Sequence, residues 1–359
     1  MNTDNLFTPL SLLRGPSLKN RLMLAPLTNR QSYPDGKASD DDIKWLEMLG
    51  AGGYSLVHTC ATTIMAGGIA FQGQLGIHSD DHLPGLARMA QAAGAGGALT
   101  SVQLHHGGFR VDRSLGGIPL PVSDGLVEER GEVNEREIVD VRDRFVEAAV
   151  RAERAGFDGV ALHGAFAFVL AQFLSSALNY RSDQYGGSLE NRSRFVFETI
   201  NAVRAAVGEH FQLGIRLSVD RHGIKVEEIR DVVAEIMRQQ QVDYIDLALW
   251  DAGQRADDGP SKGRKMLDLF TELPRHGVRL GTAGKIMGAQ RAAELLEEGC
   301  DFVLIGRAAC IHPDVPNRIA ANPEYISPQL PVNEHLLRSQ GMSPQLIAYL
   351  RTWPDFVSS

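Results

Sequence analysis

The chain has 359 residues, 43% of them hydrophobic, and a formal net charge of −8 at pH 7. A chain of this length buries a large core without disulfide support, and its three cysteines, odd in number and without metal-ligand spacing, indicate free thiols in a reducing compartment. The N-terminus has no signal-like segment and no apolar stretch is long enough to span a bilayer, so we expect a cytoplasmic protein. The absence of basic clusters argues against nucleic acid or an anionic membrane as a partner.

One pattern recurs along the chain: a helical stretch ends at a glycine or a polar residue, and a short apolar strand follows. The strands are continuous apolar runs, which is typical of a parallel sheet buried on both faces. Eight such units predict an α/β protein with one (β/α)8 TIM-barrel domain over residues 1–359. A doubly wound sheet is the alternative, but nothing in the chain indicates a reversal of strand order. The expected strands lie within 21–28, 50–60, 93–106, 154–164, 211–219, 240–250, 275–284 and 298–309.

Helix starts are readable at three places. Asn134 and Glu137 have the spacing of a capping box, Ser39 and Asp42 form a weaker version of it, and Ser188 is a candidate N-cap. Apolar residues then recur at helical spacing, which predicts one buried face for each helix. The expected buried residues are Ile138, Val141, Phe145, Ala149 and Ala152 in one helix, and Phe195, Val196, Thr199, Ile200 and Val203 in another.

Two connections are longer than the short loops typical of barrels. Residues 107–133 follow the third expected strand, and residues 251–266 follow the sixth. Both leave the carboxyl end of the barrel, where barrel enzymes place their chemistry, and we therefore expect both to be active-site loops. For the glycine-rich and charged stretch 251–264, decoration or disorder is the alternative. We expect residues 322–359 to form a C-terminal tail.

Two sequence strings carry a family resemblance. SDQYGGSLENR (182–192) is too specific to arise from composition, and LKNRLMLAPLT (18–28) accompanies it. The chain resembles the old yellow enzyme family of FMN-dependent NADH:flavin oxidoreductases over nearly its whole length. The resemblance implies FMN as cofactor, NADH or NADPH as reductant, and a small-molecule substrate with an activated alkene, such as an α,β-unsaturated carbonyl compound.

The resemblance assigns flavin contacts to polar residues at the ends of the expected strands. Thr28 offers a hydroxyl to a flavin carbonyl oxygen, and the side-chain amide of Gln103 suits the pyrimidine edge of the ring. Arg216, on an otherwise apolar strand, would stabilise the reduced flavin by its charge; an internal ion pair with Asp246 is the alternative. The neighbours expected beside the flavin are Pro26, Leu27 and Ala61.

A phosphate site is expected at the ends of the seventh and eighth strands. Gly284 and Lys285 follow one strand, and Gly306 and Arg307 follow the other. Glycines allow the backbone N–H groups to approach an anion, and the loops after these two strands form the recurrent phosphate site of barrels. We expect these residues to hold the FMN phosphate. No metal site is expected, because the histidine pair at 105–106 lacks a carboxylate partner.

The sequence departs from the family at the segment expected to bind substrate. The family pattern there is His-x-x-Asn/His-Gly-Tyr, and this chain has His163, Phe166 and Phe168 at the three functional positions. His163 keeps one hydrogen bond to a substrate carbonyl, but the second donor and the proton-donating tyrosine are replaced by phenylalanine. The arginine usual after the third strand is also displaced by one residue, with Phe109 in its place and Arg110 following.

Several functions are compatible with this pattern. The first is reduction of an activated alkene, with the proton supplied by water or another residue. The second is isomerisation or desaturation on the same flavin, and the third is flavin binding with weak catalysis. From a different class, a cofactor-free barrel aldolase or lyase would need a Schiff-base lysine, and Lys285 is the only lysine near a strand end. The physiological substrate and the oligomeric state, a homo-oligomer included, are left open by the sequence.

Overall fold

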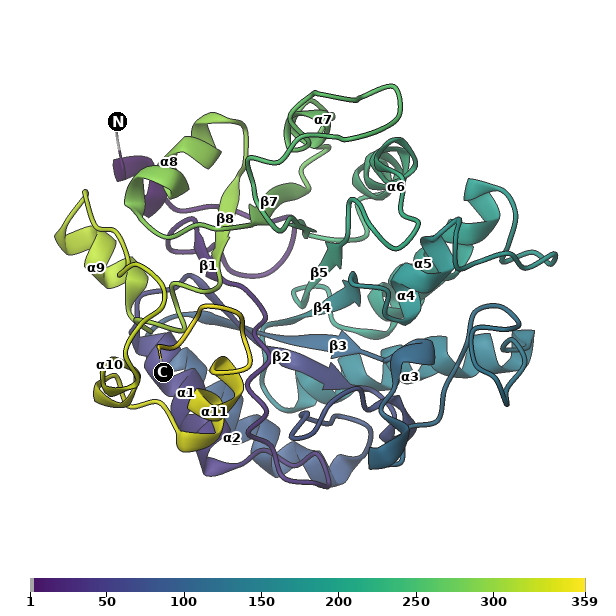
Figure 1. Ribbon diagram of the computed structural model, residues 1–359, viewed down its shortest axis with the longest axis horizontal. Coiled ribbons are helices and arrows are strands. Elements are labelled where there is room, and N and C mark those ends of the chain that lie inside the picture. Colours follow the sequence, from purple (N-terminus) through teal and green to yellow (C-terminus); the bar gives the residue numbers. More distant parts are fainter. Residues whose placement is uncertain (1–2, 359) are drawn as a thin grey trace.

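Eight parallel strands close into a barrel in the computed structural model, which describes residues 3–358. Each strand pairs with its neighbours in sequence, and β8 pairs with β1 (Figure 1). The predicted single-domain TIM barrel is thus confirmed, and the doubly wound alternative is excluded because the strand order never reverses. The strands are β1 (Leu22–Leu24), β2 (Leu56–Thr63), β3 (Leu99–His105), β4 (Gly159–Gly164), β5 (Gln212–Leu217), β6 (Tyr244–Ala248), β7 (Arg279–Ala283) and β8 (Phe302–Ile305).

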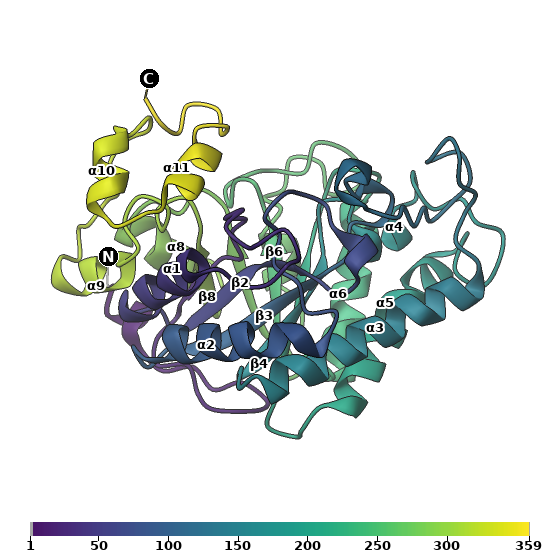
Figure 2. The ribbon, with the colours of Figure 1, turned by 90° about the horizontal axis from the view of Figure 1, so that it is seen from below.

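Helices surround the barrel and fill most of the connections between strands (Figures 1 and 2). The α-helices are α1 (Asp40–Ala51), α2 (Leu83–Gly94), α3 (Glu135–Arg154), α4 (Val169–Leu174), α5 (Leu189–Ala206), α6 (Val226–Gln239), α7 (Asp268–Thr271), α8 (Ala289–Glu297), α9 (Val315–Ala321), α10 (Glu334–Ser339) and α11 (Pro344–Leu350). The 3-10 helices are η1 (Thr3–Phe7), η2 (Ala66–Gly68), η3 (Asp80–His82), η4 (Gly108–Arg110) and η5 (Arg113–Leu115). Among residues 3–358, the longest apolar helical stretches fall short of what a membrane crossing requires.

The helix starts predicted from sequence are confirmed. Ser39 begins α1 and Asn134 begins α3, each with both hydrogen bonds of a capping box. The Ser188 hydroxyl accepts from the backbone N–H of Asn191 at the start of α5. Every residue expected on the inward faces of α3 and α5 is buried. These local signals are reliable because a cap satisfies backbone N–H groups that no other part of the helix can satisfy.

The interior of the barrel is packed with side chains. Met23, Tyr244 and Phe302 belong to one buried cluster inside it. Glycine is required on two strands to admit the aromatic rings: a Cβ at Gly214 would lie 2.2 Å from Cζ of Tyr244, and one at Gly281 would lie 2.4 Å from Cδ2 of Phe302. Because the interior is filled, a ligand has to bind at the ends of the strands.

The C-terminal segment 322–358 is a folded cap rather than the expected tail. In Figure 2 its helices α10 and α11 (yellow) stand above one side of the barrel. The segment closes on itself, since the N–H of Val332 donates to the carbonyl of Phe356 (2.9 Å) and the N–H of Ser358 donates back to Val332 (2.8 Å). Leu350 and Phe356 are buried. Two short helices give only weak periodic patterns, so the sequence does not predict this role.

Candidate active site

A cavity lies at the carboxyl ends of the strands and has two adjoining parts. The larger has a volume of about 620 Å³ and the smaller about 340 Å³. The two parts share several wall residues, so they are continuous. The shared residues are Pro26, Thr28, Phe166, Arg216, Trp250 and Tyr349.

All residues singled out from the sequence as site residues line this cavity. Pro26, Thr28, Phe166 and Arg216 line both parts, as stated above. The larger part adds Leu27, Gly284, Lys285, Gly306 and Arg307. The smaller part adds Ala61, Gln103, His163 and Phe168. The barrel thus brings together residues from seven different strand ends, although their individual roles in binding stay predictions.

Strand register places polar side chains of neighbouring strands side by side in the wall of the smaller part of the cavity. Arg216 on β5 lies between His163 on β4 and Asp246 on β6 as direct strand partners. Ala61 on β2 pairs in the same way with Gln103 on β3. Gln103 is buried, and its side-chain Nε2 has no hydrogen-bond partner among the residues described. An amide donor left free in a cavity wall is available to a ligand acceptor.

Arg216 forms the internal ion pair that the sequence analysis held as the alternative. Its Nη1 lies 2.5 Å from Oδ2 of Asp246, and both side chains are buried. Burial raises the pKa of Asp246, and the guanidinium of Arg216 opposes that shift. Arg216 nevertheless lines both parts of the cavity, with its Cζ 5.7 Å from the centre of the Phe166 ring. The ion pair therefore holds the cation in place at the cavity wall rather than removing it.

His163 is a neutral hydrogen bonder at the wall of the smaller part. Burial, and secondly the charge of Arg216, lower the pKa of His163 to about 3. At neutral pH the imidazole therefore carries one N–H and one acceptor nitrogen. Aromatic rings confine it, with centroids of His105 at 5.5 Å, Phe166 at 5.7 Å and Phe168 at 5.1 Å. Its Nδ1 is buried without a partner within residues 3–358, which leaves this atom for a ligand or water.

The segment that departs from the family is a tight turn between β4 and α4. Phe166 and Ala167 both have a left-handed backbone, with φ of 57° and 55°. The turn is fixed from two sides: the N–H of Phe166 donates to Oγ of Ser218 (2.9 Å), and Nη1 of Arg110 donates to the carbonyl of Phe166. Left-handed non-glycine residues cost roughly 1–2 kcal/mol each and concentrate at functional sites. The turn holds the Phe166 ring against the cavity and against Trp250, at a centroid distance of 5.9 Å.

The ends of β7 and β8 suit a phosphate group. A Cβ on Gly306 would meet no protein atom closer than 3.8 Å, so glycine leaves open space beside the cavity. The guanidinium of Arg307 has no hydrogen bond or ion pair to another described residue. Lys285 is less free than expected, because its Nζ pairs with Oδ2 of Asp251 at 3.0 Å. Open backbone and an unpaired arginine fit the FMN phosphate, and Arg307 is the stronger candidate.

Several cavity residues were missed by the sequence analysis. Trp250 lies two residues past the end of β6, and its position at the end of the expected strand was a usable signal. Arg30 lies two residues past Thr28 and lines the smaller part. The C-terminal cap contributes Tyr349 and Trp353, and no pattern in the sequence connects that segment to the barrel mouth.

The long loops differ in what they give to the cavity. Residues 107–133 supply Arg110 to its wall. Residues 251–266 form an ordered loop, closed by a bridge between Arg255 and Lys265, and none of them lines either part of the cavity. Their assignment as an active-site loop stays a prediction. Across residues 3–358, no cluster of three or more His, Cys, Asp or Glu side chains could hold a metal.

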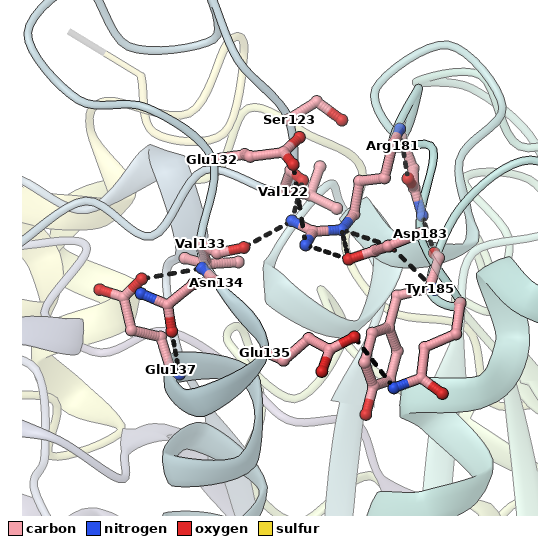
Figure 3. A network of polar contacts seen from close by, with 12 residues as sticks. Val122, Ser123, Glu132, Val133, Asn134, Glu135, Glu137, Arg181, Asp183 and Tyr185 are labelled. Carbon is pink, nitrogen blue, oxygen red and sulfur yellow. Dashed lines mark hydrogen bonds and ion pairs between the residues drawn. The ribbon is translucent and has the colours of Figure 1, made fainter.

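The string that first carried the resemblance lies outside the cavity. The buried guanidinium of Arg181 donates to the carbonyls of Val122 (2.9 Å) and Val133 (2.6 Å) and pairs with Asp183 at 2.5 Å (Figure 3). The N–H of Tyr185 in turn donates to Asp183 (3.0 Å). This network ties the end of loop 107–133 to the segment between α4 and α5. Arg181, directly before the string, and Asp183 and Tyr185 within it therefore stabilise the loops around the barrel mouth, and no residue of 182–192 lines either part of the cavity.

Comparison with known proteins identifies the family. The sequence model of the NADH:flavin oxidoreductase / NADH oxidase family matches residues 5–324. The chain belongs to this family, the old yellow enzyme family, and is an FMN-dependent oxidoreductase that uses NADH or NADPH as reductant.

Individual relatives agree with this assignment. The chain is 32% identical to the probable NADH-dependent flavin oxidoreductase YqiG of Bacillus subtilis over 321 residues, which cover 86% of each protein. It is also 32% identical to an NADPH dehydrogenase of Bacillus pumilus, over 88% of this chain and 94% of that protein. Among solved structures, morphinone reductase in complex with tetrahydroNAD superposes with a TM-score of 0.77 at 27% identity, over 90% of this chain and 93% of that one.

Proposed function

We propose that the protein reduces an activated alkene in a small molecule, with NADH or NADPH as the electron source. The observation that carries the proposal is His163, a buried neutral imidazole with a free ring nitrogen, in an aromatic-walled cavity at the strand ends. A neutral hydrogen-bond donor suits a carbonyl oxygen that gains negative charge when hydride adds to the conjugated double bond. The similarity to morphinone reductase, whose structure was solved in complex with tetrahydroNAD, supports a nicotinamide as the electron source.

The cavity residues divide into cofactor and substrate groups under this proposal. Arg307 and the backbone beside Gly306 would hold the FMN phosphate, and Gln103 would hydrogen-bond the pyrimidine edge of the ring. Arg216 would place its charge beside that ring, held by Asp246. When bound, FMN supplies hydride transfer between the nicotinamide and an organic substrate.

Substrate activation relies on fewer groups than the family pattern provides. His163 donates one hydrogen bond, whereas Phe166 has no donor, and losing one such donor typically costs about 2.7–4 kcal/mol of barrier. Phe168 has no proton to give, and losing a positioned acid costs roughly 10²–10⁴ in rate. The proton then comes from water or another residue. We therefore expect slow reduction of ordinary enones and better turnover of a substrate that the other cavity residues activate.

A flavin-dependent isomerase or desaturase is the second candidate. Phe168 favours it, because its ring packs 4.3 Å from His105 and presents no acid to the cavity. An enzyme that removes hydrogen from its substrate, or moves a double bond, does not need a strong proton donor at that place.

The test is single turnover under anaerobic conditions. The holoenzyme is reduced by NADH or by NADPH, and reoxidation of its flavin is followed after mixing with cyclohexenone or with other activated alkenes. Reoxidation with formation of the saturated product supports the proposal. Full reduction by a nicotinamide, followed by no reoxidation with any alkene, would favour the second candidate. Release of FAD or of no flavin on denaturation would contradict the cofactor assignment.

A further inference from the structure

A buried carboxylate that the proposed function does not use lies behind the cavity wall. Asp42 is the third residue of α1, and its side chain is buried. The backbone N–H of Ser39 donates to Oδ2 of Asp42 (3.0 Å), which completes the capping box of this helix. The carboxylate also accepts two hydrogen bonds from the segment 28–32, which follows β1. A helix cap alone does not require these two bonds.

The two additional hydrogen bonds come from both sides of one turn. Nδ2 of Asn29 donates to Oδ1 of Asp42 (2.8 Å), and Oγ of Ser32 donates to Oδ2 (2.9 Å). Asn29 and Ser32 are themselves buried. Between them, Arg30 has a left-handed backbone with φ of 56°. A non-glycine residue keeps such a conformation only where its surroundings fix it, and here the carboxylate binds a residue on each side of it.

The turn held by Asp42 belongs to the cavity wall. Thr28, directly before Asn29, lines both parts of the cavity, and Arg30 lines the smaller part. The Cζ of Arg30 also lies 4.7 Å from the ring centre of Tyr349 in the C-terminal cap. Because Thr28 and Asn29 share a peptide bond, a shift of the Asn29 backbone moves the hydroxyl of Thr28 as well. Asp42 itself lines neither part of the cavity.

We propose that Asp42 is a positioning residue of the active site: its carboxylate fixes the turn 29–32 and thereby places the hydroxyl of Thr28 beside the flavin. The inference rests on the expected contact between Thr28 and a flavin carbonyl oxygen. It concerns reduction of the cofactor by the nicotinamide, whatever substrate is reduced afterwards. A hydrogen bond to the ring tunes the flavin potential, so a displaced hydroxyl alters that potential. A misplacement of about 1 Å can slow a reaction roughly 10²-fold.

Two substitutions of Asp42 separate its hydrogen bonds from its charge. Asp42→Ala removes every acceptor, whereas Asp42→Asn retains the bonds if the amide of Asn29 rotates. That rotation is open, because Oδ1 of Asn29 is buried without a partner among residues 3–358 and can accept from the new amide. We expect Asp42→Ala to shift the flavin midpoint potential and to slow reduction of the bound flavin by NADH by about 10–10²-fold. Asp42→Asn should stay close to the natural protein in both.

A double-mutant cycle with Thr28→Val tests whether the effect passes through the hydroxyl. Asp42→Ala should shift the potential in the natural background and add little in a Thr28→Val background. Amide hydrogen exchange of residues 29–32 gives a readout without turnover. It should be faster in Asp42→Ala, with or without flavin, and unchanged in Asp42→Asn.

Asp243→Ala is the matched control. Asp243 is a second buried carboxylate, which accepts from the N–H of Leu213 (2.7 Å) and pairs with Arg14. Burial raises the pKa of both carboxyl groups. Asp243 lies directly before β6, at the opposite end of the barrel from the cavity, so its loss should lower stability without a change in the flavin potential.

Several outcomes would overturn the inference. They are an unchanged potential and reduction rate in Asp42→Ala or in Thr28→Val, additive effects of these two substitutions, and an equal shift in Asp243→Ala. If Asp42→Ala does not fold, Ser32→Ala removes a single hydrogen bond and gives the same test with a smaller expected shift. All these measurements precede the addition of an alkene, so a failure of the reductase proposal would leave them unaffected.

Discussion

Two segments, one at the end of β4 and one between α4 and the first turn of α5, differ in what their residues do. In 181–192 the polar side chains are used inside the protein: Arg181 alone contacts two backbone carbonyls and Asp183 (Figure 3). In 163–168 the side chains of His163, Phe166 and Phe168 face the cavity. The string 182–192 within the first segment matches the family, and the second segment departs from it. A string that identifies a family can thus do so through loop packing, while the chemistry is decided by a few residues nearby.

The largest effect, on the rate of flavin reoxidation, is expected from substitutions that restore the family pattern in segment 163–168. Changing Phe166→Asn together with Phe168→Tyr supplies a second donor and a phenol, whose pKa near 10 keeps it protonated at neutral pH. We expect reoxidation by cyclohexenone to rise by roughly 10²–10⁴. Stopped-flow measurement of the reduced holoenzyme checks this, with Phe168→Tyr alone giving a smaller gain. A natural protein already as fast as the double variant would mean that another group protonates the substrate.

Substitution in the segment 181–192 should change the stability of the protein rather than its reaction rate. Arg181→Ala leaves Asp183 and two buried carbonyls without their partner, and we expect a loss of about 3 kcal/mol in the free energy of unfolding. Urea denaturation followed by circular dichroism measures it. Arg113→Ala, which removes an exposed ion pair with Glu129, should change stability by less than about 0.5 kcal/mol. A stable Arg181→Ala protein with weakened flavin binding would show that the segment belongs to the site after all.

Substitution of Arg216 tests the role of the cavity wall in flavin binding and leaves the segment 163–168 unchanged. Arg216→Ala should weaken flavin binding about tenfold or lower the flavin potential, because the cation beside the ring is lost. It also leaves Asp246 buried and unpaired, so the double variant Arg216→Ala with Asp246→Asn is the control. Flavin occupancy and redox titration are measured for both. Recovery of normal flavin properties in the double variant would mean that Arg216 serves only the ion pair.

Acid titration should separate the two segments by the pH range in which each changes stability. The unfolded His163 takes up a proton below about pH 6.5, whereas burial keeps the folded imidazole neutral to about pH 3. The unfolded state therefore binds more protons, and this group lowers stability as the pH falls from about 6.5, by up to about 1.4 kcal/mol per unit. His163→Asn should remove that part of the pH dependence.

Asp183 contributes favourably to stability, in contrast to His163, and its contribution is lost at lower pH. Its hydrogen bonds from Arg181 lower its pKa, so its contribution to stability is complete above about pH 4 and is lost as the pH falls through the folded value. The stability difference between the natural protein and Asp183→Asn should accordingly stay constant from pH 7 to about 5 and shrink below 4. A difference that changes already near pH 6 would contradict the assignment.

The sequence by itself determined the barrel, its helix caps and thirteen residues of the cavity wall. Continuous apolar runs separated by helices fix a parallel barrel, and a parallel barrel brings every strand end to one face. Thr28, Gln103, His163 and Gly306 could therefore be placed together from the sequence, because position at a strand end is a local property of the chain.

Only the tertiary structure decided which charges meet. The pairing of Arg216 with Asp246 depends on the register between β5 and β6, and the pairing of Lys285 with Asp251 depends on the fold of a loop. The stacking of Arg30 on Tyr349 joins residues more than 300 positions apart, through a C-terminal cap with no strong periodic pattern. Such contacts are set by packing between distant segments, and local sequence carries little information about them.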